Sequence, residues 1–102
     1  MKLTIVTVVF NDLPGLLKTI ASLSVLDRND IEYWVIDGGG DGTVKKYLES
    51  TKWIKWLSEP DDGIYDAMNK GLDSATADYE LFMNAGDCIH RDFSLDYFFL
   101  NP

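Results

Sequence analysis

Two carboxylates of this chain stand where an apolar segment ends, which is a place where a side chain can meet a small molecule. Asp37 follows the apolar segment Ile31 to Ile36 and is itself followed by three glycines, while Asp87 comes shortly after Leu81 to Met83. A carboxylate accepts hydrogen bonds from N–H groups, and glycines allow a ligand to approach the backbone closely. The same pattern is typical of an aspartate that caps the following turn, so both interpretations of Asp37 stay open.

A third polar segment, Glu59 to Gly63, places acidic side chains around a proline just before a predicted helix. The first turn of a helix offers backbone N–H groups that have no intrahelical partner. These groups can receive an anion, or they can be capped by Asp61 or Asp62. For Asp41, which opens Asp41-Gly42-Thr43, we predict a structural role at a helix start.

The segments between these residues alternate between two hydrophobic patterns. Continuous apolar runs predict buried strands, and leucine or isoleucine at helical spacing predicts helices. The predicted strands are Leu3 to Phe10, Ile31 to Ile36, Trp53 to Leu57 and Tyr79 to Met83. The predicted helices are Pro14 to Leu26, Thr43 to Ser50 and Gly63 to Ala75, the first capped by Asn11 or Asp12. This alternation predicts an α/β fold with a Rossmann-like, mostly parallel sheet and helices on both faces.

The predicted sheet brings three polar segments to one edge. They are Phe10-Asn11, Asp37 to Gly40, and Asn84 to Asp87, and each follows a predicted strand. In open α/β sheets, ligands bind beyond the carboxyl ends of the strands, where neighbouring strands can place side chains around one small molecule. The sequence therefore predicts a single ligand site at that edge.

Charge and cysteine content limit the function classes. The 102 residues include 9 Lys and Arg against 17 Asp and Glu, a formal net charge of -8 that disfavours nucleic-acid binding. Cys88 is the only cysteine, so no intrachain disulfide can form, and we expect it to be a small buried side chain. No segment approaches the roughly 20 apolar residues of a membrane span. We expect a cytoplasmic protein, with a peripheral position at the inner face of the membrane left open.

Four segments resemble, in order, those of family-2 glycosyltransferases with the GT-A fold. They are Thr4 to Asn11, Val35 to Thr43, Ser58 to Gly71 and Leu81 to Asp87. The likeness covers residues 3 to 88 and is strongest to bacterial enzymes that build cell-surface polysaccharides. It implies that residues 1–102 are a single nucleotide-sugar-binding domain, a partial GT-A fold. It also implies that the acceptor-binding portion and the catalytic general base lie beyond residue 102.

The resemblance implies roles for individual residues. Asp37 would accept a hydrogen bond from the nucleobase, and Asp87 would hold Mg²⁺ or Mn²⁺ against the donor diphosphate. This chain departs from the family at Asp62, where relatives often have Lys, and at Met68, where many have Arg. The predicted donor-binding residues are Phe10, Asn11, Asp37, Gly39, Asp62, Gly63 and Asn69.

The implied reaction moves a sugar from a nucleotide-diphosphate donor, most commonly a UDP-sugar in this family, to a glycan or lipid-linked acceptor hydroxyl. The anomeric carbon would be inverted. An acidic chain would repel a diphosphate unless a divalent cation intervened, and this favours metal dependence. The corresponding metal segment, Asn84-Ala85-Gly86-Asp87, has one carboxylate where the family usually has two or three.

Two alternatives compete with the enzyme interpretation. In the first, the chain is a non-catalytic α/β nucleotide-binding or interaction domain, and Asp37, Asp41 and Asp87 are caps. In the second, it is a flavodoxin-like or receiver-like domain, which also gathers aspartates at strand ends. The apolar tail from Phe93 to Leu100 must cover the sheet, pair in a homodimer or contact another part of the protein.

Overall fold

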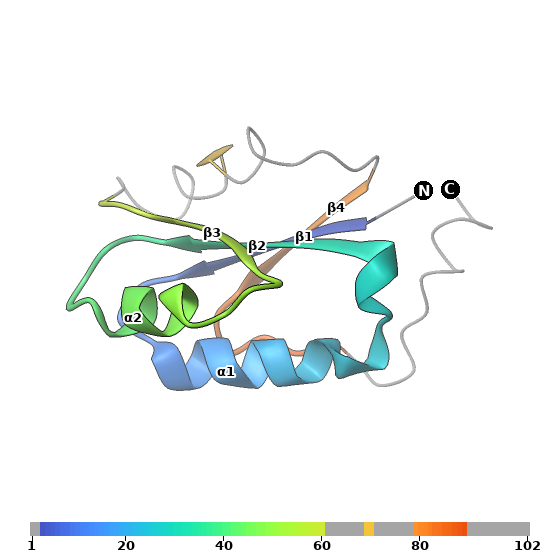
Figure 1. The fold of residues 1–102 in the computed structure, drawn as a ribbon, viewed down its shortest axis with the longest axis horizontal. Helices are drawn as coiled ribbons and strands as arrows, with labels where there is room; N and C mark the ends of the chain where they lie inside the picture. The colour runs from blue at the N-terminus through green and yellow to red at the C-terminus, as the bar shows by residue number, and fades with distance from the viewer. Residues whose placement is uncertain (1–2, 61–68, 71–78, 90–102) are drawn as a thin grey trace.

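The computed structural model describes residues 3–60, 69–70 and 79–89, and within them the chain forms a four-stranded parallel sheet (Figure 1). The strands are β1 (Leu3–Val9), β2 (Ile31–Asp37), β3 (Lys55–Ser58) and β4 (Tyr79–Asn84). Their order across the sheet is β3-β2-β1-β4, and all three neighbouring pairs are parallel. The predicted α/β fold with a Rossmann-like sheet is therefore confirmed.

The strand order also decides between two kinds of α/β fold. In the flavodoxin-like arrangement β1 lies between β2 and β3, whereas in the Rossmann arrangement it lies between β2 and β4. Here β1 pairs with β2 on one side and with β4 on the other. The flavodoxin-like or receiver-like alternative is therefore wrong.

Both complete helices in the described residues lie on one face of the sheet, below the strands in Figure 1. They are α1 (Leu13–Ser22) and α2 (Thr43–Glu49), which connect β1 to β2 and β2 to β3. The two connections step in the same direction across the sheet, and right-handed crossovers then place both helices on the same side. Asn69 and Lys70, which are also helical, lie on the opposite face. The remainder of the predicted helix from Gly63 to Ala75 is outside the described residues.

Alternation along the strands divides the apolar side chains between the two faces. Ile5 and Val35 contribute to the larger core, which also contains Leu16 of α1 and Val44 of α2. The intervening side chains form a smaller cluster on the other face, with Trp34, Leu57 and Phe82 packed around Val6, Val8 and Ile36. Burial on both faces explains why the central strands are largely apolar in sequence.

Element boundaries differ from the prediction most at the end of α1. The helix ends at Ser22, and a 3₁₀ turn (η1, Leu23–Val25) replaces the predicted last turn. Leu26 is extended, yet it is buried in the larger core. The spacing of the apolar residues correctly predicted which side chains are buried. It did not predict the α-helical conformation, because a 3₁₀ turn can bury the same side chains.

The third strand begins two residues later than predicted, at Lys55. Trp53 does not pair in the sheet; its ring stacks on Tyr33, with centroids 5.5 Å apart, and the Arg28 guanidinium lies 4.3 Å from its centroid. Trp53 is therefore a packing residue. Among the helices of the described residues, none combines the length and the apolar character needed to cross a membrane.

Candidate functional site

The carboxyl ends of the four strands meet at one edge of the sheet, here called the rim, and define the candidate site. In register, Val9 lies beside Asp37, Asp37 beside Ser58, and Val8 beside Asn84. Backbone hydrogen bonds continue past the strand ends: Gly38 N–H donates to the Val9 carbonyl, Glu59 N–H to that of Asp37, and Ala85 N–H to that of Val8, each at 3.0 Å. The three polar segments that the sequence placed at one edge therefore do lie side by side.

Phe10, the first residue after β1, presents an aromatic ring at the rim. Its side chain is 63% exposed, although the preceding seven residues of the strand are all buried. An exposed phenylalanine at a strand end offers a flat apolar surface on which a planar ring can stack.

Asn11 joins two loops at the rim. It has a positive φ of 50°, and its side-chain oxygen accepts a hydrogen bond of 2.9 Å from the backbone N–H of Asp41. Gly40, with φ of 76°, faces this side chain so closely that a Cβ at position 40 would overlap the Asn11 amide. The contact fixes the loop after β1 against the loop after β2.

Asp37 is completely buried beneath these loops. One carboxylate oxygen accepts a hydrogen bond of 2.7 Å from the Ser58 hydroxyl, and the other accepts one of 3.3 Å from the Gly39 N–H. Both oxygens therefore hold neighbouring segments of the rim. The cap role that the sequence left open for Asp37 is present in the structure.

Asp41 has the structural role that the sequence predicted. Its carboxylate accepts the Thr43 backbone N–H at 2.9 Å, at the start of α2. This hydrogen bond holds the pKa of Asp41 below its usual value, although the side chain is exposed. Asp12 similarly caps α1, accepting the Gly15 N–H at 2.9 Å, and Gly15 leaves room for that carboxylate.

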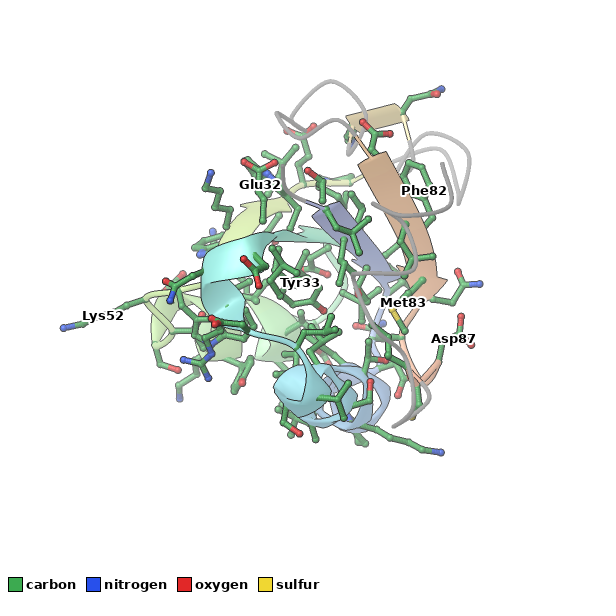
Figure 2. All side chains as sticks on the ribbon, turned by 90° about the vertical axis from the view of Figure 1, so that its right-hand side faces the viewer. Glu32, Tyr33, Lys52, Phe82, Met83 and Asp87 are labelled. Atoms are coloured by element: carbon green, nitrogen blue, oxygen red, sulfur yellow. The ribbon has the colours of Figure 1, made fainter. Side chains whose placement is uncertain are left out.

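Asp87 lies at the β4 end of the rim, in a tight turn. Its carboxylate accepts the Asn84 N–H at 2.9 Å, and its own N–H donates to the Asn84 carbonyl at 2.9 Å. Gly86 supplies the positive φ of 100° that this turn requires. The side chain is exposed and points away from the protein interior, where Tyr33 lies (Figure 2).

One carboxylate is a small donor set for a metal ion. In residues 3–60, 69–70 and 79–89, no three His, Cys, Asp or Glu side chains come together as metal ligands would. The bond to Asn84 uses only Oδ2 of Asp87, which leaves Oδ1 for an added ligand. Mg²⁺ is often held by one or two carboxylates while substrate phosphates complete its shell, so Asp87 fits an ion that arrives with a diphosphate.

Lys70 is a rim contact that the predicted site did not include. Its ammonium lies 3.0 Å from the Glu59 carboxylate and donates to the Pro60 carbonyl at 3.2 Å. These contacts bring the neighbouring Asn69, which is exposed, to the β3 end of the rim. The predicted residues Asp62 and Gly63 are outside the described residues, as is the tail from Phe93 to Leu100.

Sequence reasoning also missed Ser58 and Thr19. Ser58 donates to Asp37, and the buried Thr19 hydroxyl of α1 bonds to the turn that carries Asp87. A hydroxyl residue in the middle of an otherwise apolar helix stripe was the available signal for Thr19. Cys88, which we expected to be buried, is exposed, because the turn after Gly86 directs it away from the core that receives Ile89.

Comparison with known proteins identifies the family. The sequence pattern described as glycosyl transferase family 2 matches residues 4–96. The chain belongs to this family. An uncharacterized glycosyltransferase of Mycobacterium tuberculosis, found in strains CDC 1551 and H37Rv, is 41% identical over 87 residues. The match covers 82% of this chain and 33% of the relative, so the chain spans about a third of the length of these curated relatives.

Solved structures show the same fold. The mannosyltransferase PcManGT from Pyrobaculum calidifontis, in complex with GDP-Man and Mn²⁺, matches with a TM-score of 0.75 and 23% identity over 89% of this chain and 29% of that one. S. aureus TarS 1-349, in complex with UDP-GlcNAc, matches with a TM-score of 0.74 and 19% identity over 90% and 28%. The family-2 chain therefore has the GT-A fold that its sequence resembled.

Proposed function

We propose that this chain binds the nucleotide-sugar donor of an inverting family-2 glycosyltransferase that acts in polysaccharide biosynthesis. The observation that carries the proposal is the rim, which gathers Phe10, Asn11, Asp37 and Asp87 at the carboxyl ends of three neighbouring strands. The complexes of structural neighbours with UDP-GlcNAc and GDP-Man give the class of ligand.

The nucleobase would lie at the β1–β2 side of the rim. The exposed Phe10 ring offers a stacking surface, and the positive φ of Gly39, 99°, leaves the backbone open to close approach. Of the two Asp37 oxygens, the one that accepts the Gly39 N–H does so at 3.3 Å, the longer of the two hydrogen bonds, so it is the acceptor that we assign to a base N–H. Asn11 would keep the two loops at the spacing that the base requires.

The diphosphate would lie toward Asp87 at the β4 side. When bound there, a Mg²⁺ or Mn²⁺ ion would neutralise charge on the departing diphosphate. Asp87 would hold the ion through Oδ1 while Oδ2 keeps its bond to the Asn84 N–H. Asp62, Gly63 and Asn69 are the remaining residues that we propose bind the donor, and of these Asn69 lies at the β3 end of the rim.

In the proposed reaction, the acceptor hydroxyl attacks the anomeric carbon as the bond to the diphosphate breaks, and the hydroxyl proton passes to a general base. No described residue is assigned this role. The acceptor, a glycan or a lipid-linked sugar, the cytoplasmic location and a homodimer through residues 93–100 all remain predictions from the sequence.

Calorimetric titration with UDP, with and without Mn²⁺, tests the proposal. We expect binding that is at least tenfold tighter with Mn²⁺, and we expect Asp87→Ala to abolish that difference. Asp30→Ala is the matched control, since Asp30 is an exposed aspartate that precedes the opposite end of β2. A parallel titration with GDP reports which base the site accepts.

The main competing function is a non-catalytic interaction domain. It is favoured by one observation: Asp12, Asp41 and Asp87 all accept backbone N–H groups, as simple caps do. The same titration distinguishes the two functions. A folded protein that binds neither UDP nor GDP, with or without Mn²⁺, would contradict the donor-binding role.

A further inference from the structure

The turn that carries Asp87 is hydrogen-bonded to a hydroxyl group in the middle of α1. Thr19 is completely buried, and its hydroxyl donates to the Asp87 carbonyl at 2.7 Å. The same oxygen accepts the Gly86 N–H at 2.9 Å. A single side chain therefore holds the backbone on both sides of the Gly86–Asp87 peptide.

Ser22, one turn further along α1, holds the next part of the same segment. Its hydroxyl accepts the Ile89 N–H at 3.0 Å and donates to the Thr19 carbonyl at 2.7 Å. The Gly15 carbonyl, one turn before Thr19, also accepts the Gly86 N–H at 3.0 Å. Residues 15, 19 and 22 lie on one stripe of the helix, because their spacing of four and three residues matches the helical repeat.

The contacts of the Thr19 hydroxyl are not the usual ones for a hydroxyl residue inside a helix. Threonine in that position commonly bonds back to the carbonyl of the preceding turn. The hydrogen bonds of Thr19 instead reach residues 67 and 68 positions away in sequence. A buried hydroxyl that satisfies both its donor and its acceptor on one turn fixes the position of that turn closely.

We propose that Thr19, assisted by Ser22, is a positioning residue for the Asp87 carboxylate. This rests on the proposed function, in which Asp87 holds the metal ion. The only hydrogen bond of the Asp87 side chain within the described residues goes to Asn84 in its own turn, so the place of the whole turn depends on the backbone contacts with α1. Groups that hold a metal ligand in place in this way also orient it, and their loss typically weakens metal affinity about 10- to 100-fold.

Three threonine variants of the 102-residue chain test the proposal. Thr19→Val removes the hydroxyl but keeps the shape, and Thr19→Ser keeps the hydroxyl. Thr4→Val is the matched control, because Thr4 is an equally buried threonine whose hydroxyl bonds to Glu32 near the far end of β1. We expect Thr19→Val to weaken the Mn²⁺-dependent part of UDP binding about tenfold. We expect the other two variants to retain it.

Amide hydrogen exchange provides a readout that needs no ligand. The Asn84 amide reports the Asp87 carboxylate, and the Gly86 amide reports the Thr19 hydroxyl. After correction for global stability, Thr19→Val should speed exchange at both amides about tenfold, and Thr4→Val should leave both unchanged.

The outcomes separate the two ideas. If the unaltered protein shows no Mn²⁺-dependent binding, the proposed function fails, and a metal-positioning role for Thr19 fails with it. If such binding exists but Thr19→Val matches Thr4→Val in affinity, or leaves Asn84 exchange unchanged, the positioning role alone is overturned. Rescue by Thr19→Ser together with faster exchange in Thr19→Val supports it.

Discussion

The two sides of the rim are built differently. On the β1–β2 side, polar side chains bond across loops: Asn11 holds the backbone of Asp41, and Asp37 holds Ser58 and Gly39. On the β4 side, Asp87 is exposed, and its side chain bonds, among the described residues, only within its own turn, while α1 holds the backbone around it. The polar side chains of the first side therefore stabilise the fold. The second side presents Oδ1 of Asp87 on a turn that is held in place by hydrogen bonds to α1. Substitutions of the buried Asp37 and of the loop junction on the first side should therefore change stability strongly, whereas substitution of Asp87 on the second side should change mainly ligand binding.

The largest expected effect is that of Asp37→Ala. Removal of a fully buried carboxylate leaves the Ser58 hydroxyl and the Gly39 N–H without their acceptor and opens a cavity, at a cost of about 3 kcal/mol in the free energy of unfolding. Urea denaturation measures it. Asp37→Asn, which keeps one acceptor oxygen, should lose roughly half as much. A loss for Asp37→Ala no larger than that for the exposed Asp87→Ala would break the comparison.

Alkaline pH tests the strands that support the first side. Tyr33 of β2 donates to the Thr7 hydroxyl of β1 at 2.8 Å, and burial raises its pKa to about 12 from 10.0. The folded state therefore keeps this proton more tightly than the unfolded state. The resulting stability is complete below pH 10 and is lost as the pH rises toward 12, by up to about 2.7 kcal/mol.

The variant Tyr33→Phe isolates this effect. At pH 8 it should be about 1 kcal/mol less stable than the unaltered protein, because the buried Thr7 hydroxyl loses its donor. Between pH 10 and 11 the difference should shrink, since the variant has no phenol to ionise at this position. Urea denaturation followed by circular dichroism from pH 8 to 11 measures both stabilities. Parallel curves over this range would contradict the raised pKa.

Gly40→Ala, which disturbs the junction between the two loops, should cost less than Asp37→Ala. The new Cβ would displace the Asn11 side chain from the Asp41 N–H, and the positive φ of 76° adds strain, for a total of about 2 kcal/mol. Gly42→Ala is the matched control, with φ of 87° but open space at the Cβ, and should cost about 1 kcal/mol. Equal thermal shifts for the two variants would show that the Asn11 contact does not stabilise the loops.

The smallest effect on stability is expected from Asp87→Ala. The exposed carboxylate contributes one hydrogen bond, to the Asn84 N–H, which water can replace, so the loss should be under about 1 kcal/mol. Thermal unfolding of this variant, measured beside the UDP titration, sharpens the comparison. A loss as large as that of Asp37→Ala would mean that Asp87 is mainly a structural cap.

Much of the fold could be predicted from the sequence, because the apolar composition of the strands distinguishes them from the segments between them. Residues of β1 and β2 are buried on both faces, and largely apolar runs suit that environment, so these two strands were predicted to within one residue. The prediction of element boundaries was weaker where a residue is buried without belonging to a helix or a strand. Leu26 is buried without being helical, and Trp53 is packed without being in a strand.

The sequence by itself determined that polar residues would follow buried parallel strands, and hence that Phe10, Asn11, Asp37 and Asp87 would share one rim. Only the tertiary structure decided what each oxygen of those residues does. Ser58 meets Asp37 across 21 residues of chain, and Thr19 meets Asp87 across 68. A hydroxyl has no preferred partner until packing brings one within about 3 Å, so contacts over such separations leave no local pattern in the sequence.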